Sequence, residues 1–296
     1  MLAPWEVYVA APAVEPQDEY LGEHHVYTPH RAGLPPLGGY VRELWRRRQF
    51  VDELARSQLR AQNYATVFGQ VWLVLSPLLN AAVYFLLVTI LRGGDHEPNF
   101  LPHLLAGIFA YSFVSGTISQ SATSVTSGGR LILNTAFPRL LLPVTQVVIA
   151  FFRFLPTLPI LALVLAVRIP DDVTWAILLA VPVFLLLVLT AAGLGFLAAV
   201  LQVYFRDFRN LLPYLLRLGL YLTPILYFAE DVPEKMKLVT TLNPLGPVFQ
   251  AWSDTIVKGT VPDAGVWGLS LMWAVLFFVA GALIYASRER EFAVRL

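Results

Sequence analysis

The sequence predicts an all-α membrane protein with six transmembrane helices. Of its 296 residues, 57% are apolar and only 14% are charged, and the mean hydropathy is +0.63. A soluble domain carries about 25% charged residues to cover its surface, so this composition favours the bilayer over water as the solvent. In addition, six stretches reach the length of roughly 20 mostly apolar residues that a spanning helix needs.

A proline-rich segment, residues 1–39, precedes the first apolar stretch. It has no basic residue before Arg31, and it has no apolar core of the length found in signal peptides. Segments rich in proline and acidic residues bury too little apolar surface to fold. We therefore expect a flexible cytoplasmic tail rather than a cleaved signal.

The next segment, residues 40–60, has the pattern of an amphipathic helix. Its apolar side chains recur at helical spacing, and they are Val41, Leu44, Trp45, Val51, Leu54 and Ala55. The opposite face carries Arg42, Arg46, Arg47 and Glu53. A basic helix of this kind is suited to the cytoplasmic surface of the membrane.

Six apolar stretches follow as predicted spans. They are Val67–Leu91, Phe100–Ser119, Leu140–Val167, Val173–Leu201, Leu211–Phe228 and Val266–Ala286. Prolines occur inside the first, third and fourth of them, among others, and the fifth and shortest contains both Pro213 and Pro224. Membrane helices tolerate such breaks where neighbours or water satisfy the freed carbonyls. The number of prolines therefore favours helices that line a pathway over a simple anchor.

A long segment, residues 229–263, separates the fifth span from the sixth and contains the sequence LNPLGPVFQAWSDTIV. Its apolar stretch is interrupted by proline and glycine and is too short to span. We expect short re-entrant helices that dip into the outer leaflet. The six-span domain is assigned to residues 61–290, and residues 291–296 to a cytoplasmic C-terminus.

The basic residues indicate the orientation of the chain. With the N-terminus placed inside, 15 lysines and arginines are assigned to the inner side, including Arg217 near the inner end of the fifth span, and 5 fall in outer segments. Cytoplasmic loops of membrane proteins carry the excess of these residues. We therefore expect a multi-pass protein of the plasma (inner) membrane with both termini in the cytoplasm. The remaining basic residue, Arg153, lies inside the third span.

Several chemistries are excluded or disfavoured by what the sequence lacks. It has no cysteine, which excludes disulfides, cysteine-ligated zinc and thiol catalysis. Its five histidines do not have the spacing of a zinc-protease motif, and no phosphate-binding loop for a nucleotide occurs. A net charge of +1 gives no electrostatic footprint for nucleic acid. We expect no catalytic residue, metal or cofactor in this chain and no nucleic-acid partner.

Four segments, taken in order, carry a family resemblance. They are QLRAQNYATVFGQVWLVLSPLLNAAVYFLL from Gln58, NTAFPRLLLPV from Asn134, YFRDFRNLLPYLLRLGLYLTPILY from Tyr204 and LNPLGPVFQAW from Leu242. With the helix order above, the chain resembles the membrane subunit of ABC-2-type exporters, in particular the polysaccharide-export branch of O-antigen, galactan and teichoic-acid permeases. The resemblance implies the ABC-2 (type V) exporter fold. It also implies a homodimer of this permease with two copies of a separate ATPase subunit, which would bind ATP and Mg.

The resemblance further implies that two inner turns are coupling elements seated on the ATPases. The first is Gly128–Arg139, with the residues Arg130, Leu131, Ile132, Phe137 and Arg139. The second is Tyr204–Asn210, with the residues Arg206, Asp207 and Arg209. An ordinary loop remains the alternative for the first turn. A topological anchor remains the alternative for the second, although it explains the arginines better than Asp207, because acidic residues contribute little to orientation.

Two further groups of residues are candidates for the transport pathway. Aromatic rings inside spans one and five offer stacking faces for sugar rings, and they are Tyr84, Phe85, Tyr214, Tyr221 and Tyr227. Candidates for contact with a lipid-linked diphosphate are Arg42, Arg46, Arg47, Arg48 and Arg153. Helix packing explains the aromatic pattern equally well. Attraction to anionic lipid explains the first four arginines, and backbone carbonyls or Gln146 are other partners for Arg153.

We therefore expect a permease subunit that exports a polysaccharide, linked to polyprenyl diphosphate, while a partner ATPase hydrolyses ATP. Export of a drug or a lipid by the same architecture is the alternative. An ion-coupled transporter is disfavoured because no predicted span contains an acidic residue. A membrane enzyme acting on polyprenyl lipids is disfavoured because the outer acidic residues form no motif for metal or proton transfer.

Overall fold

The computed structural model describes residues 34, 36–62, 68–91, 93, 97–135, 137–172 and 174–295. Within these ranges the chain is helical and has no β-strand. The helices long and apolar enough to cross a membrane, by length and composition, are Gly69–Leu91, Phe100–Ser127, Leu141–Arg168, Trp175–Tyr204 and Ala264–Glu291. The predicted class of all-α, multi-pass membrane protein is therefore confirmed, and these five correspond to the first four predicted spans and the sixth.

These five segments contain six of the labelled helices. They are α3 (Trp72–Leu91), α4 (Phe100–Ser127), α6 (Leu141–Phe154), α7 (Thr157–Arg168), α8 (Ala180–Tyr204) and α12 (Ala264–Arg288). The third segment is divided into α6 and α7 at Pro156, which has no N–H to donate and disfavours a continuous helix. The chain direction is nevertheless kept, because Leu155 still donates its N–H to the carbonyl of Phe151 at 3.1 Å.

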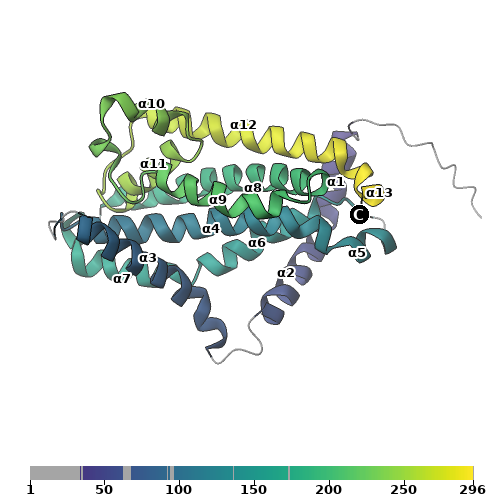
Figure 1. Cartoon of the computed structure of the whole chain (residues 1–296), viewed down its shortest axis with the longest axis horizontal. Coiled ribbons are helices and arrows are strands. Elements are labelled where there is room, and N and C mark those ends of the chain that lie inside the picture. Colours follow the sequence, from purple (N-terminus) through teal and green to yellow (C-terminus); the bar gives the residue numbers. More distant parts are fainter. Residues whose placement is uncertain are drawn as a thin grey trace, which may run out of the picture. The chain divides into compact units, whose positions relative to one another are not determined.

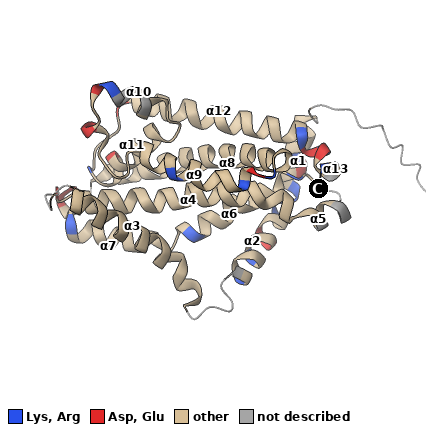
Figure 2. Cartoon of the chain, viewed as in Figure 1, with Lys and Arg blue, Asp and Glu red and all other residues tan. Residues whose placement is uncertain are grey.

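Helix α4 is the centre of the molecule and the most buried of these helices. It packs against α8 on one side and α6 on the other (Figure 1). In Figure 2, α4 and α12 carry almost no charged residues along their length. The large buried side chains Phe100, Leu104 and Phe109 come from its first half. This burial explains why α4 is less amphipathic than a surface helix, since most of its surface meets protein.

Two glycines of α8 bring three helices into close contact. A Cβ atom on Gly193 would lie 2.3 Å from the carbonyl carbon of Phe277 in α12, and one on Gly281 would lie 2.4 Å from the carbonyl oxygen of Gly193. On the other side, a Cβ on Gly195 would lie 2.9 Å from Oγ of Ser121 in α4. Small residues allow membrane helices to approach backbone to backbone, and here they position α8 between α4 and α12.

The fifth predicted span differs from the structure. Helix α9 is Phe208–Leu222, which is 15 residues long, and the prediction of one helix through Phe228 is wrong. At about 1.5 Å per residue, α9 is shorter than the roughly 30 Å of a bilayer core. It ends because Thr223 is extended (φ −95°, ψ 140°). Pro224 follows it directly, and proline disfavours the helical conformation in the residue before it.

The predicted amphipathic helix is two helices, α1 (Leu37–Arg46) and α2 (Arg48–Gln62). The backbone leaves the helical conformation at Arg47 (φ −94°, ψ 16°). This break lets α1 bring Tyr40 to the end of α12 while α2 packs on α6. The predicted tail, residues 1–39, lies outside the described residues except for Leu34 and the stretch from Pro36 onward.

The segment after α9 contains the two expected short helices, α10 (Glu234–Leu242) and α11 (Gly246–Ile256). Helix α11 is almost entirely buried against α4, α8 and α12. The indole N–H of Trp252 donates to the carbonyl of Ala106 in α4 at 3.1 Å. Short helices in this segment are therefore confirmed, and their insertion into a membrane leaflet stays a prediction.

One end of the helix bundle, here called the α13 end, gathers α1, α5 (Gly129–Asn134) and α13 (Phe292–Arg295) (Figure 1). The hydroxyl of Tyr40 donates to Oε2 of Glu289 at 2.7 Å, and the backbone N–H of Arg139 donates to the same oxygen at 3.2 Å. Helices α1, α5 and α13 come from segments that the distribution of basic residues assigns to the cytoplasmic side, and all three lie at the α13 end.

The other end, here called the α10 end, is closed by contacts between loops that are distant in sequence. Nδ2 of Asn99 donates to Oδ2 of Asp172 at 3.3 Å. The hydroxyl of Thr174 donates to the carbonyl of Gly259 at 2.5 Å. These bonds join the loops before α4, before α8 and before α12, so the bundle is tied at both ends.

Candidate functional site

The structure brings together aromatic residues of the first and fifth predicted spans. The rings of Tyr84 in α3 and Tyr221 in α9 meet edge to face, with their centroids 6.4 Å apart. Tyr221 is 44% exposed, and Tyr214, two turns earlier on α9, is 69% exposed. Of the α9 side chains only Leu212 and Leu220 are buried. Helices α3 and α9 thus present an exposed face of apolar and aromatic side chains, here called the α3–α9 face.

The other two predicted pathway aromatics lie elsewhere. Phe85 is stacked on Phe100 of α4 at a centroid distance of 6.3 Å, so its ring faces the core. Tyr227 follows the end of α9, and its carbonyl oxygen is 3.1 Å from Nε2 of His103. Tyr227 was predicted to lie inside the fifth span with Tyr214 and Tyr221, but it does not share their helix, because α9 ends at Leu222.

A residue that sequence reasoning missed fixes the position of α9. The hydroxyl of Tyr111 in α4 donates to the carbonyl oxygen of Leu216. A Cβ atom on Gly219, one turn later, would lie 3.0 Å from the same hydroxyl. A tyrosine in the middle of an apolar span needs a partner for its O–H, and this need was the available signal. Tyr111 therefore anchors the helix that displays Tyr214 and Tyr221.

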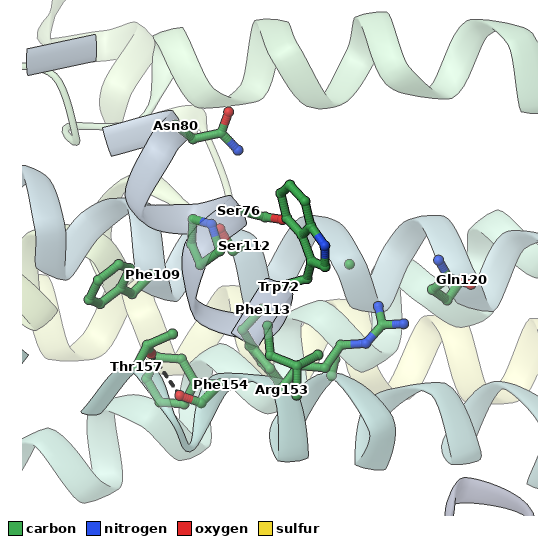
Figure 3. Close-up of a pocket in the computed structure, with 14 residues that line it drawn as sticks. Trp72, Ser76, Asn80, Phe109, Ser112, Phe113, Gln120, Arg153, Phe154 and Thr157 are labelled. Atoms are coloured by element: carbon green, nitrogen blue, oxygen red, sulfur yellow. Dashed lines mark hydrogen bonds between the residues drawn. The ribbon is translucent and has the colours of Figure 1, made fainter. Parts of the chain in front are cut away.

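Arg153 lines a cavity of about 510 Å³ between α3, α4 and the α6–α7 break. The polar residues around it are Ser76, Asn80, Ser112, Gln120, Arg153 and Thr157. Figure 3 shows the guanidinium of Arg153 extended on the side of Gln120, with Trp72 and Ser76 of α3 nearby. Among the described residues, no acidic side chain lines this cavity. The hydroxyls of Ser112 and Thr157 donate to backbone carbonyls, so the amide and guanidinium donors of the cavity are the groups suited to an anion.

The arginines of α1 and α2 lie at the surface. Arg46 and Arg47 form ion pairs with Glu43, at 3.1 Å and 2.5 Å. The hydrogen bond from Arg47 is the main cause that lowers the pKa of the Glu43 carboxyl. Arg48 lies over the ring of the exposed Trp45, with its guanidinium carbon 5.2 Å from the ring centre.

Arg42 is exposed as well. The exposed face of α1 thus combines cations with apolar side chains such as Val41 and Trp45, a composition that suits the headgroup region of a bilayer.

The first predicted coupling turn packs partly inside the chain. Ile132 is buried, and Leu131 and Phe137 are partly buried against the same apolar cluster. The ring of Phe137 lies 5.4 Å from that of Phe50 in α2. Leu131 and Phe137 keep part of their surface exposed, whereas the side chain of Arg130 lies outside the described part of the structure.

The second predicted coupling turn is exposed and basic. Arg206 and Arg209 line a cavity of about 440 Å³, together with Gln202, Asn210 and Arg295. Asp207 is exposed and stands at the start of α9, where its side chain does not cap the helix. The turn therefore presents cations around one acidic side chain at the same end of the bundle as α13.

A partly buried carboxylate at the α13 end, that of Glu289, was also missed from the sequence. Glu289 accepts the Tyr40 and Arg139 bonds described above, and the guanidinium of Arg139 donates to its carbonyl oxygen. The hydroxyl of Tyr285 donates to the carbonyl of Arg139 at 2.9 Å. Burial, followed by the charge of Glu289, raises the pKa of the Tyr40 hydroxyl. Predicted coupling residue Arg139 is thereby joined to α1 and α12.

In the described ranges, no three His, Asp or Glu side chains gather closely enough to hold a metal ion.

Comparison with known proteins gives consistent relatives, although no family model matches the chain. It is 29% identical over 257 residues to the O-antigen export system permease protein RfbA of Myxococcus xanthus, covering 86% of this chain and 97% of that protein. It is 25% identical over 242 residues to a protein of the same name from Klebsiella pneumoniae, covering 81% of this chain and 92% of that protein. A second Klebsiella pneumoniae protein of that name is 26% identical over 210 residues, which are 70% of this chain and 80% of its own length.

These relatives share one description and align with most of the chain. The helices described above are those of a membrane protein, in agreement with a permease. The resemblance drawn from the sequence is confirmed: over most of its length, the chain is similar to O-antigen export system permeases.

Proposed function

We propose that this chain is the membrane-spanning subunit of an ATP-driven exporter that moves a polysaccharide from the cytoplasm across the plasma membrane. The observation that carries this proposal is the similarity to O-antigen export permeases over 81% and 86% of the chain. The chain provides the pathway, and a separate ATPase subunit binds ATP and Mg and supplies the energy.

In the proposed arrangement both termini lie in the cytoplasm and the α13 end faces inward. Helix α9 and the turns that follow it as far as Phe228 together make the fifth of six crossings, in the manner of the ABC-2 (type V) exporter fold. The α8–α9 turn and the turn that contains α5 would then contact the ATPase. Both turns lie at the α13 end, which supports this arrangement. The backbone N–H of Arg139 donates to Glu289, and the hydroxyl of Tyr204 donates to Glu291, shortly before α13.

Two copies of the chain would form the working pathway, with two ATPase subunits. The α3–α9 face supports this proposal, because its large apolar side chains and aromatic rings are exposed in the single chain and a second copy could cover them. A second copy facing it would enclose a passage lined by Tyr84, Tyr214 and Tyr221. Sugar rings stack on such aromatic faces, so a glycan of repeating units would slide without sequence-specific hydrogen bonds.

We infer that the glycan enters attached to polyprenyl diphosphate. The exposed arginines of α1 support this inference, since each basic residue near an anionic membrane surface contributes about 1 kcal/mol of attraction. They lie at the α13 end, where the lipid-linked substrate would arrive.

The proposed function is tested by deleting the gene in its own cell and following the glycan. We expect surface glycan to disappear from intact cells while lipid-linked glycan accumulates inside, and the native gene to restore the surface signal. Purification of the tagged chain should also recover a separate ATPase subunit. Unchanged surface glycan in the deletion strain would refute the proposal, and recovery of the chain alone would refute its ATP-driven part.

A further inference from the structure

One face of α4 is polar over much of its length. Ser112, Gly116, Gln120, Thr123 and Ser127 follow one another at intervals of three or four residues, which places them on one side of the helix. From first to last they extend over roughly 22 Å at about 1.5 Å per residue. All five are partly exposed or exposed, although most of α4 is buried. The hydroxyls of Ser112, Thr123 and Ser127 donate to carbonyl oxygens of α4 itself, so the side-chain amide of Gln120 is the group of this face with donors to offer a ligand.

These five residues line two cavities that meet at Gln120. The first is the cavity of about 510 Å³ that contains Arg153. The second, of about 400 Å³, lies between α2, α4, α5 and α6 and includes Gln120, Thr123 and Ser127. We call the two together the α4 groove. The groove thus leads from α2 and α5, at the α13 end, to Arg153 deep among the long helices.

The walls of the α4 groove differ in chemistry. At its mouth, Nε2 of Gln146 in α6 donates to Oε1 of Gln58 in α2 at 3.1 Å. Its inner wall is the polar face of α4, and its outer wall includes Trp72, Leu73 and Pro77 of α3. Neither cavity is lined by aspartate or glutamate, and Arg153 is the one charged residue among those that line them.

We propose that the α4 groove takes the diphosphate head group of a membrane lipid and that Arg153 binds it at the inner end. An arginine binds phosphate oxygens with two parallel N–H donors, and the side-chain amide of Gln120, where the two cavities meet, supplies further donors. The volume of the Arg153 cavity lies within the range of about 300–1,000 Å³ that is typical of ligand sites. The identity of the lipid as polyprenyl diphosphate rests on the proposed function, whereas the groove and its anion preference do not.

This proposal places the lipid tail outside the groove, in the bilayer. Helix α3 has a largely exposed apolar surface beside the groove, including Leu79, Val83 and Leu86. A head group moving along α4 would stay in contact with polar side chains while its tail stayed in hydrocarbon. A charge in the bilayer is costly unless it is paired or hydrated, so the groove lowers the barrier that the head group meets.

The test uses the absence of cysteine in the natural chain, because a single introduced cysteine is then the only thiol of this chain, and labelling is measured on this chain after it is separated from the ATPase. The full chain with its co-purified ATPase is placed in phosphatidylcholine nanodiscs and treated with a water-soluble maleimide. The reporters are Ser112→Cys beside Arg153 and Thr123→Cys nearer the mouth. Val181→Cys is the control. Val181 is exposed near the start of α8, inside the apolar segment Trp175–Tyr204, and it does not line the α4 groove.

We expect both reporters to react at least about tenfold faster than Val181→Cys, because a thiol must be hydrated to form the reactive thiolate. Polyprenyl diphosphate in the nanodisc should slow labelling of Ser112→Cys about fivefold, which corresponds to a concentration about four times the dissociation constant. Arg153→Gln should remove this protection, and Arg153→Lys should keep part of it. Thermal unfolding of each variant shows that it is folded.

Several outcomes would overturn the inference. Labelling of both reporters as slow as that of Val181→Cys means that the groove is dry. Equal protection with Arg153→Gln excludes the arginine as the binding residue. Equal protection by phosphatidylglycerol excludes a preference for the diphosphate, and equal protection by free inorganic diphosphate excludes a lipid-borne head group. If polyprenyl diphosphate does not protect Ser112→Cys but the chain exports glycan, only the proposed lipid site is refuted. If it does protect Ser112→Cys but the deletion strain keeps its surface glycan, only the proposed function is refuted.

Discussion

At the scale of single residues, Gly193 has the tightest environment among the glycines of the long helices. Its α-carbon faces the backbone of α12 at a distance that leaves no room for a side chain. A side chain added at Gly193 would push α8 and α12 apart, because a backbone cannot move aside as a flexible side chain would.

We predict that Gly193→Leu lowers the free energy of unfolding by about 1–3 kcal/mol or more, the usual cost of an overpacked core. Thermal unfolding of the detergent-solubilised protein measures this change. Gly268→Leu is the matched control on α12, since a Cβ atom there meets nothing within 4 Å. Equal stability of the two variants would contradict the close contact of α8 and α12.

A single tyrosine decides whether the α3–α9 face acts in transport. Tyr221 is partly exposed and touches Tyr84, so its ring is available to a sugar chain. We predict that Tyr221→Ala reduces glycan export about fivefold, or about 1 kcal/mol, the scale of one aromatic contact, while Tyr221→Phe exports normally. Surface glycan per unit of protein gives the measurement.

Phe85→Leu is the control for that experiment, because the Phe85 ring packs on Phe100 in the core. It should change stability more than export. Export that is unaffected in Tyr221→Ala would leave helix packing as the explanation for the aromatic pattern.

At the scale of elements, the α8–α9 turn is the sharpest candidate for coupling. Asp207 is exposed among arginines, and its side chain does not cap α9, so its removal leaves the helix start unchanged. We predict that Asp207→Ala lowers export about fivefold, at the low end of typical coupling energies, with unchanged thermal stability. Export and ATPase recovery are measured together. Normal export with full ATPase association would remove Asp207 from the coupling role.

The interrupted elements show which local signals were readable. Pro224 and Pro156 are visible in the sequence, and each stands at a helix break in the structure. The end of α9 was therefore within reach of the sequence, whereas the break at Arg47 was not. No proline or glycine stands at Arg47; the separation of α1 from α2 follows from their different partners, Glu289 and α6.

At the scale of the whole molecule, the cysteine-free chain allows a direct test of topology. We predict that Gln49→Cys reacts with an impermeant maleimide only from the cytoplasmic side and Thr260→Cys only from the outside. Both positions are exposed and lie at opposite ends of the chain's helices. Labelling of intact cells compared with inside-out vesicles gives the measurement. Labelling of both from one side would contradict an odd number of crossings between them.

The candidate site was predictable only in part, for a reason that applies to the whole fold. Tyr84 and Tyr221 were chosen as aromatic residues in apolar spans, and the structure brings their rings together. Tyr111 was not chosen, because its role depends on the carbonyl of Leu216, which lies 105 positions later in the chain. Hydrophobic periodicity shows which residues share one face of a helix, but it does not show which other helix packs against that face.

The class of the protein, the order of its long helices and its resemblance to O-antigen export permeases could be predicted from the sequence alone. These properties depend on local composition, hydropathy and short segments, which the amino acids carry wherever the chain is placed. Only the tertiary structure decided that α4 is central, that Glu289 joins α1 to α12, and that a polar face of α4 leads to Arg153. Each of these is a contact between helices, and it depends on packing geometry that distant segments define together.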